Sequence, residues 1–286
     1  RAGFVRRFAR RAAEKALEGA EPPRAQLDVM SDEKLLFFTD AGNCYAVGVS
    51  QIPECRPRDR GLPLGGLLAG LAADERFTFV YAPGKEWAGE MTLLTEGGLI
   101  KRMAVADLNV RKARYAALTL REGDKLAAVL PPTSCKDVLV VTRQGMAICF
   151  SLAEVSVLGR TAAGVKAIQL APADRATACI AHDGEGEALL VTDRGYMNRS
   201  LLLDFDRQAR GGKGLKAITF LKNGMNGEAI AAALPVREAR AFTVFQKSGA
   251  QAAFNTEEIA IETRAGKGQP YVLAVMGDSV EDVLMG

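Results

Sequence analysis

Several residue types that build active sites are scarce in this chain. Its 286 residues include one histidine, His182, and five cysteines without a Cys-x-x-Cys pair. A lone histidine leaves no His-based metal cluster, and no Ser or Cys triad is suggested. The glycine-rich segments lack the order of a phosphate-binding P-loop. We therefore expect no catalytic residue, no metal and no cofactor in this chain.

Other shortages narrow the class of protein. Aromatic residues make up 6% of the chain, with Trp87 the single tryptophan, which argues against a surface that stacks sugars or nucleotide caps on rings. There is no apolar run of 18 residues and no signal peptide. Cys44 and Cys149 lie in apolar runs, so we expect buried, reduced thiols and a cytoplasmic protein without a membrane partner. The chain begins with Arg1 rather than Met, which indicates a fragment.

Charge is nearly balanced. The chain has 37 basic and 34 acidic residues and a net charge of +3. Total charge therefore does not indicate a nucleic-acid partner, and any basic surface must come from where the cations are placed.

What the chain does contain is a repeated phrase. An apolar run, two or three polar residues and a glycine are followed by a second apolar or basic run. The phrase predicts a β-hairpin whose turn needs a positive φ. A period near 50 residues with strand content predicts one propeller-like all-β array. The turn glycines are Gly42, Gly98, Gly145, Gly195 and Gly249.

Each hairpin is followed by a polar, glycine-containing segment and a closing apolar run, which together suggest about four strands per unit. Residues 3–8 match the second half of the hairpin phrase, and residues 10–18 are rich in helix formers. We predict a single domain over residues 1–286, with a partial first blade joined by its end to the last. The blades are 1–33 (partial), 34–89, 90–136, 137–186, 187–240 and 241–286.

The polar segments place cations beside glycine at the same point of all five full repeats. Repetition around a ring would align them along one edge, where glycines admit phosphates and cations attract them. The alternative is a set of ordinary solvated turns. We predict contacts to double-stranded DNA from Arg58, Arg60, Arg111, Lys112, Arg114, Arg160, Lys166, Arg207, Gln208, Arg210, Gly211, Gly212, Lys213, Gly214, Lys216, Arg264 and Lys267.

A second group of cations lies in the hairpins, near the turn glycine. For these residues, DNA contact and a role as solvent-facing charges on exposed strand positions are equally good interpretations. They are Lys101, Arg102, Arg194 and Arg199. His182 precedes Asp183-Gly184, which predicts a surface turn.

The segment Gln208-Ala209-Arg210-Gly211-Gly212-Lys213-Gly214 resembles the gyrase A box, Gln-Arg-Arg-Gly-Gly-Lys-Gly, with alanine in place of one arginine. With the ordered repeats, nearly the whole chain is similar to the C-terminal domain of the A subunit of bacterial type IIA topoisomerases. The resemblance implies a β-pinwheel, a disc whose blades exchange strands and whose basic outer edge bends DNA.

The resemblance also implies a context. Catalytic residues would lie outside this chain, in the ATPase B subunit or in the N-terminal part of the same A subunit, within the bacterial cytoplasm at the nucleoid. The isolated domain would be monomeric. No box occurs in residues 9–30, which favours topoisomerase IV over gyrase. A propeller that only binds proteins is one alternative, and a propeller enzyme with a polar central channel is another.

Overall fold

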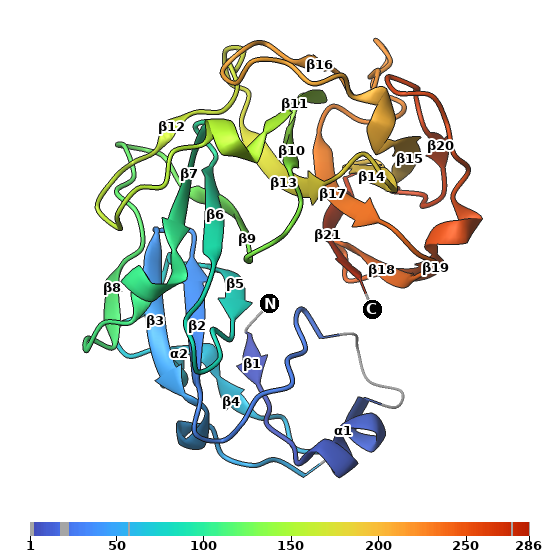
Figure 1. The fold of residues 1–286 in the computed structure, drawn as a ribbon. Coiled ribbons are helices and arrows are strands. Elements are labelled where there is room, and N and C mark those ends of the chain that lie inside the picture. Colours follow the sequence, from blue (N-terminus) through green and yellow to red (C-terminus); the bar gives the residue numbers. More distant parts are fainter. Residues whose placement is uncertain (1–2, 18–22, 57, 276, 286) are drawn as a thin grey trace.

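Five β-hairpins, each turned at one of the predicted glycines, organise the structure. The computed structural model describes residues 3–17, 23–56, 58–275 and 277–285. The described strands form four sheets of four strands, one of three and one of two, arranged side by side around an open ring (Figure 1). This confirms the predicted all-β array of five full repeats and one partial N-terminal blade.

One sheet shows the plan of a blade. Its hairpin consists of β10 (Asp137–Thr142) and β11 (Met146–Ser151), with β13 (Ala176–His182) on the inner side and β16 (Leu215–Lys216) on the outer side. Figure 1 shows β13 towards the centre of the ring and β16 at its periphery. The strand β16 belongs to the next repeat, so neighbouring blades exchange a strand, as the resemblance implied.

The other blades follow the same order from the centre outwards. The first is β5 (Phe77–Tyr81), β2 (Lys34–Thr39), β3 (Asn43–Gly48) and β8 (Arg114–Ala116). The second is β9 (Leu126–Leu130), β6 (Glu90–Thr95), β7 (Leu99–Ala104) and β12 (Val165–Lys166). The fourth is β17 (Ile230–Val236), β14 (Glu187–Thr192), β15 (Tyr196–Leu201) and β20 (Gln269–Pro270). The last has β21 (Val280–Met285), β18 (Ala241–Gln246) and β19 (Gln251–Asn255).

Apolar side chains between adjacent sheets hold the blades together. All six residues of β10 are buried, because this central strand has a neighbouring sheet on both faces. Leu94 and Ile100 of one blade pack in the same cluster as Val138 and Val140 of the next. Burying a side chain of this size contributes roughly 1.5–3 kcal/mol, so these contacts supply much of the stability of the ring.

The hairpin turns require glycine because of their backbone conformation. All five have a positive φ, between 74° and 93°. At Gly145 a Cβ atom would also lie 2.7 Å from Ile218 Cγ2, which belongs to the segment leading out of β16. A side chain there would therefore strain the turn and push away the exchanged segment.

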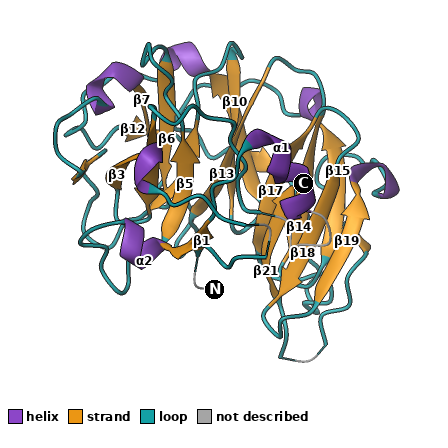
Figure 2. Cartoon of the chain, turned by 90° about the horizontal axis from the view of Figure 1, so that it is seen from below, coloured by secondary structure: helices purple, strands orange, loops and turns teal. Residues whose placement is uncertain are grey.

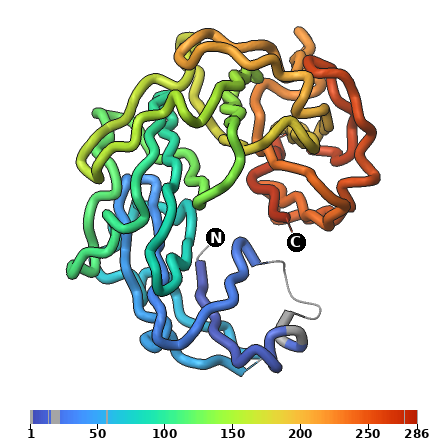
Figure 3. The backbone as a smooth tube through the Cα atoms, in the orientation of Figure 1, coloured from blue at the N-terminus to red at the C-terminus, as the bar shows by residue number. Residues whose placement is uncertain are grey.

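The partial blade and the ends of the chain lie at the open side of the ring. The strands β1 (Phe4–Val5) and β4 (Leu62–Pro63) pair, and the expected helix forms as α1 (Arg10–Leu17). Arg24 makes an ion pair with Asp282 of the last blade. Among the described residues no strand of the N-terminal segment joins the last sheet, so the expected shared sheet between the ends is not seen there (Figure 3).

The remaining helices are short. They are α2 (Leu64–Leu67) and the 3-10 turns Val49–Gln51, Val105–Leu108, Leu152–Glu154, Leu202–Asp204 and Thr256–Glu258. Each 3-10 turn directly follows the second strand of a hairpin, and Figure 2 shows the helices outside the sheets. They redirect the chain from the hairpin to the polar segment that carries the predicted DNA contacts.

Candidate nucleic-acid interface

Exposed cations gather on the outermost strands and on the segments leading into them. Lys166 of β12 and Lys216 of β16 occupy the same register position, opposite Leu99 and Met146 respectively. Within the described residues, two of these exposed rim cations have an ion pair with an acidic side chain, Arg114 with Glu75 and Arg207 with Asp137. The exposed cations of the predicted set are Arg58, Arg60, Arg111, Lys112, Arg114, Lys166, Arg207, Lys213, Lys216 and Lys267.

The box-like segment lies against the preceding hairpin. At Gly214, with φ 74°, a Cβ atom would lie 2.3 Å from the Ala147 carbonyl oxygen of β11. Gly211 also has a positive φ, of 85°. Packing of the segment thus accounts for Gly214, while Lys213 beside it is exposed to solvent.

Arg210 serves the fold in a way that the sequence did not reveal. Its Nε donates to the Glu154 carbonyl oxygen at 3.2 Å, and its Nη1 donates to the Lys166 carbonyl oxygen. The guanidinium therefore holds the outer strand β12 of the neighbouring blade.

Arg264 repeats this arrangement one blade further on. It donates to the Asp204 carbonyl oxygen at 2.9 Å and to the Lys216 carbonyl oxygen at 2.8 Å. Two equivalent arginines making equivalent bonds indicate a clamp between repeats. Their contact with DNA stays a prediction.

Several other predicted cations are engaged within the protein. Arg207 pairs with Asp137 at 2.7 Å. Arg102 pairs with Glu90 at 3.1 Å and donates to the Val155 carbonyl oxygen at 3.0 Å. An arginine in such a pair can still attract a phosphate, but the neighbouring carboxylate already compensates part of its charge.

The remaining predicted cations differ in their surroundings. The guanidinium groups of Arg60, Arg114 and Arg160 lie over the rings of Phe4, Tyr45 and Tyr115 at 4.4, 5.5 and 5.4 Å. Arg114 also pairs with Glu75 at 3.6 Å. Arg194 and Arg199 are half-buried, and the Arg199 Nε has no partner among the described residues.

Lys101 departs from its predicted place at the surface. Its side chain is completely buried, and Nζ donates to four backbone carbonyl oxygens at 2.9 to 3.0 Å, those of Ala117, Gly159, Arg160 and Ala162. Burial lowers the pKa of this lysine to about 8. It cannot reach DNA from this position, so neither predicted role is correct. In the hairpin it pairs opposite Leu93, which is also buried.

His182 lies directly before the predicted surface turn, in which Asp183 and Glu185 are exposed. The histidine itself ends β13 and is only 2% exposed. Its Nδ1 accepts from the Gly184 N–H at 3.0 Å, and Nε2 lies 3.4 Å from Cys149 Sγ. Burial lowers the pKa of the imidazole. The predicted burial of Cys44 and Cys149 as free thiols is confirmed.

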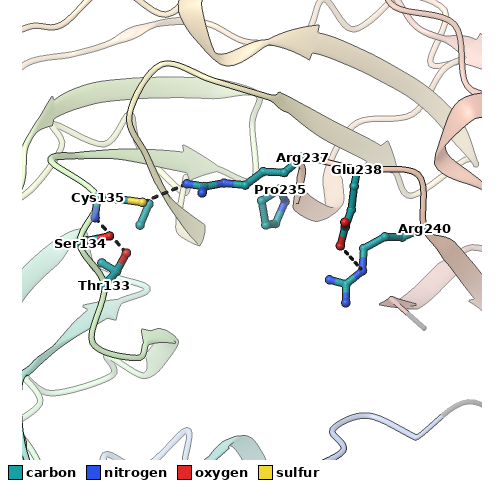
Figure 4. Close-up of a pocket in the computed structure, with 8 residues that line it drawn as sticks. Thr133, Ser134, Cys135, Pro235, Arg237, Glu238 and Arg240 are labelled. Carbon is teal, nitrogen blue, oxygen red and sulfur yellow. Dashed lines mark hydrogen bonds and ion pairs between the residues drawn. The ribbon is translucent and has the colours of Figure 1, made fainter.

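A separate cavity of about 340 Å³ lies between the links β9–β10 and β17–β18, away from the outermost strands. Arg237 Nη2 points at Cys135 Sγ at 3.0 Å, while Arg240 pairs with Glu238 at 3.9 Å (Figure 4). The described residues contain no group of three metal-ligating side chains. No helix among them is long and apolar enough to cross a membrane.

Comparison with known proteins relates four of the repeats to a described family. The model of the DNA gyrase C-terminal domain, a beta-propeller, matches residues 33–80, 90–133, 136–183 and 186–237. The DNA gyrase A protein of Chlamydia pneumoniae is 31% identical over 267 residues, which cover 92% of this chain and 32% of that protein. The gyrase A protein of Staphylococcus epidermidis is 32% identical over 209 residues, covering 71% and 23%. The chain thus spans about a third or less of these relatives.

Solved structures share the fold. The C-terminal domain of DNA topoisomerase IV aligns with a TM-score of 0.89 at 21% identity, covering 99% of this chain and 90% of that one. The DNA gyrase A C-terminal domain aligns with a TM-score of 0.73 at 19% identity, covering 90% and 83%. With four matched repeats and this architecture, the chain belongs to the family of DNA gyrase C-terminal beta-propeller domains.

Proposed function

We propose that this chain binds and bends double-stranded DNA along its outer edge, as a non-catalytic domain of a type IIA topoisomerase A subunit. The observation that carries the proposal is the row of exposed cations on successive outermost strands. Lys166 and Lys216 repeat at one register position on neighbouring blades, and Lys213 and Lys112 precede such strands.

A curved row of cations suits a duplex that follows the ring. Contacts to phosphates do not depend on base identity, so binding would be tolerant of sequence. Bending a short site costs on the order of 1–6 kcal/mol, which must be offset by contacts spread over several blades. The exchanged strands support this role, because they fix the position of each cation relative to the next blade.

The rest of the enzyme would supply the chemistry. In this proposal the cleavage site belongs to the N-terminal part of the A subunit, while the ATPase site belongs to the B subunit. The domain itself would be monomeric when isolated and would work in the bacterial cytoplasm, on nucleoid DNA.

We favour topoisomerase IV over gyrase as the parent enzyme, because residues 9–30 contain no box, and residues 10–17 of that stretch form α1. The names of the curated relatives support gyrase as the alternative. Reconstituted enzyme acting on relaxed plasmid and, separately, on catenated DNA circles decides between them: ATP-dependent negative supercoiling of the plasmid would assign the chain to gyrase, while decatenation without supercoiling would assign it to topoisomerase IV.

A salt series tests the central proposal. Binding of unrelated duplexes should weaken alike as salt rises, with a slope near −5 in log affinity against log salt for about six phosphate contacts. A flat response to salt, or binding restricted to one base sequence, would contradict a surface that contacts the backbone of DNA.

A further inference from the structure

Two arginine-rich segments lie side by side in the partial first blade. Residues 3–11 contain four arginines and no acid, while residues 54–61 contain three arginines and two acids. This excess is larger than the net charge of +3 of the whole chain, so the remainder of the molecule is net acidic. Such a concentration is a local property that the overall composition hides.

Backbone pairing holds the two segments together. Val5 pairs with Leu62, and the Leu64 N–H donates to the Gly3 carbonyl oxygen at 2.9 Å. Further along, the Cys55 N–H donates to the Arg7 carbonyl oxygen at 2.7 Å. This pairing brings the arginines of both segments into the same part of the partial blade, and we call this group the arginine surface: Arg6, Arg10, Arg11, Arg56, Arg58 and Arg60.

The arginine surface is available for a ligand. Arg10, Arg11, Arg56, Arg58 and Arg60 are exposed, and Arg6 is half-buried. Among the described residues none of the six has an ion pair with an acid. The nearby Asp59 carboxylate accepts from the backbone N–H of Arg56 at 2.8 Å. Counting Glu54 and Asp59 as negative, residues 3–11 contribute +4 and residues 54–61 contribute +1, so the two segments keep a net charge of +5.

Two of these guanidinium groups are already oriented. Arg60 lies over the ring of Phe4 at 4.4 Å, and Arg6 lies over Phe8 at 5.3 Å. Stacking occupies the face of the guanidinium and leaves its edge donors for a planar or tetrahedral anion. Paired N–H donors of this kind suit phosphate oxygens better than lysine ammonium groups do.

The position of the surface connects it to the rim. Phe4 pairs with Pro63 of β4 just as Leu99 pairs with Lys166 of β12, so β4 is the counterpart of the other outermost strands. Arg58 and Arg60 precede β4 as Lys213 precedes β16. Figure 1 shows β16, β12, β8 and β4 following one another around the periphery, with α1 beyond β4.

We propose that the arginine surface is the terminal phosphate-binding part of the DNA track, extending the track past the last outer strand onto α1. This inference rests on the proposed DNA-binding function. It adds a place where the duplex is held, at the open side of the ring, and it assigns contacts to Arg6, Arg10, Arg11 and Arg56.

The test compares two charge-matched double variants of the 286-residue chain. Arg10→Gln/Arg11→Gln removes two charges from the surface while glutamine keeps the helix propensity of arginine. Arg121→Gln/Arg143→Gln removes two charges from exposed turns of other blades. If both α1 arginines contact phosphates, the first variant should lose roughly 60-fold in affinity at about 0.1 M salt and about 1.8 in salt slope. The control should stay near the parent.

Footprinting gives an independent measurement. The protected stretch of DNA should shorten at one end in Arg10→Gln/Arg11→Gln, and Arg58→Gln should weaken binding without unfolding the chain. An unchanged slope and footprint in both variants, with the parent binding normally, would overturn the inference and point to an acidic protein partner for this surface. Failure of the parent to bind DNA would instead refute the proposed function itself.

Discussion

The segments that lead into β16 and β20 share one backbone plan and differ in charge. In both, an arginine holds the preceding repeat through two carbonyl oxygens, Arg210 in one and Arg264 in the other. Residues 207–216 carry four cations and no acid, whereas residues 261–270 carry two cations and Glu262. The exposed end of the outer strand is Lys216 in the first and Pro270 in the second.

The difference separates residues that the fold needs from residues that are free to vary. Gly214 and Gly268 both have positive φ and both would place a Cβ within 2.8 Å of a hairpin carbonyl oxygen. The clamp arginines are likewise common to both segments. Exposed lysines are not needed for packing, so their placement can set the strength of DNA binding blade by blade.

Removing the rim lysines should have the largest effect. For Lys166→Ala/Lys213→Ala/Lys216→Ala we expect roughly a 500-fold loss of DNA affinity at about 0.1 M salt, with a slope less steep by about 2.7, because three phosphate contacts are lost. Thermal melting should change little, since all three side chains are exposed.

The matched control is Lys136→Ala/Lys222→Ala/Lys247→Ala, three exposed lysines outside the outermost strands. Equal losses in the two triple variants would show that only net charge matters. Full affinity in the rim variant would remove these lysines from the interface.

The Arg210→Ala variant removes the guanidinium that donates to the Glu154 and Lys166 carbonyl oxygens. We expect this loss to lower the free energy of unfolding by about 1–3 kcal/mol. Arg210→Lys keeps the charge but not the fork of donors, so we expect it not to restore stability. Urea unfolding of both variants, with Arg264→Ala for comparison, measures this effect. If lysine restores DNA affinity fully and alanine leaves stability unchanged, Arg210 is a phosphate contact and not a clamp.

Charge can also be added to the less basic of the two segments, at the end of β20. Pro270 pairs opposite Tyr196 as Lys216 pairs opposite Met146. Pro270→Lys should therefore extend the basic track by one contact, raising affinity roughly 8-fold at about 0.1 M salt. Pro270→Gln controls for removal of the proline ring and should bind like the parent. No gain in the lysine variant would place the DNA path away from β20.

Local sequence patterns predicted the elements that depend on local structure. The hairpins around Gly98 and Gly145, the helix after Arg10 and the repeat period all follow from neighbouring residues. The exchanged outer strands β12 and β16 have two residues each, too few to show a period, and their pairing came only from the family resemblance. Basic residues beside glycine marked the rim segments but did not distinguish Arg210, which clamps, from Lys213, which is exposed.

The buried polar residues were missed for a related reason. Lys101 looks like a surface cation in the phrase Leu99-Ile100-Lys101-Arg102, yet four carbonyl oxygens surround its ammonium group. Those carbonyls come from residues 16 to 61 positions away. No local pattern carries that information.

The smallest expected effect concerns the buried residues on which segments 207–216 and 261–270 pack. Under residues 207–216, Arg207 pairs with Asp137, and the buried His182 lies next to Asp137 across the sheet and contacts Cys149. Under residues 261–270, the corresponding bridge joins Ile261 to Arg199, and β14 pairs there with Val236 in place of histidine. Of the two, therefore, the first segment lies over a histidine, whereas valine occupies the corresponding position under the second.

Because burial lowers the pKa of His182 in the folded state, the unfolded chain binds a proton first as pH falls. Stability is therefore fully present above the unfolded pKa of about 6.5 and decreases as pH falls below it, by at most about 1.4 kcal/mol per pH unit from this group. Urea unfolding at pH 7.5 and pH 5.5 should show a smaller difference for His182→Gln than for the parent chain. Groups other than His182 contribute equally to both proteins, so the His182 contribution is the difference in pH dependence between them. An identical pH dependence would mean that protonation of His182 is accommodated without loss, and that the base of the box-like segment is as insensitive to acid as the base of residues 261–270.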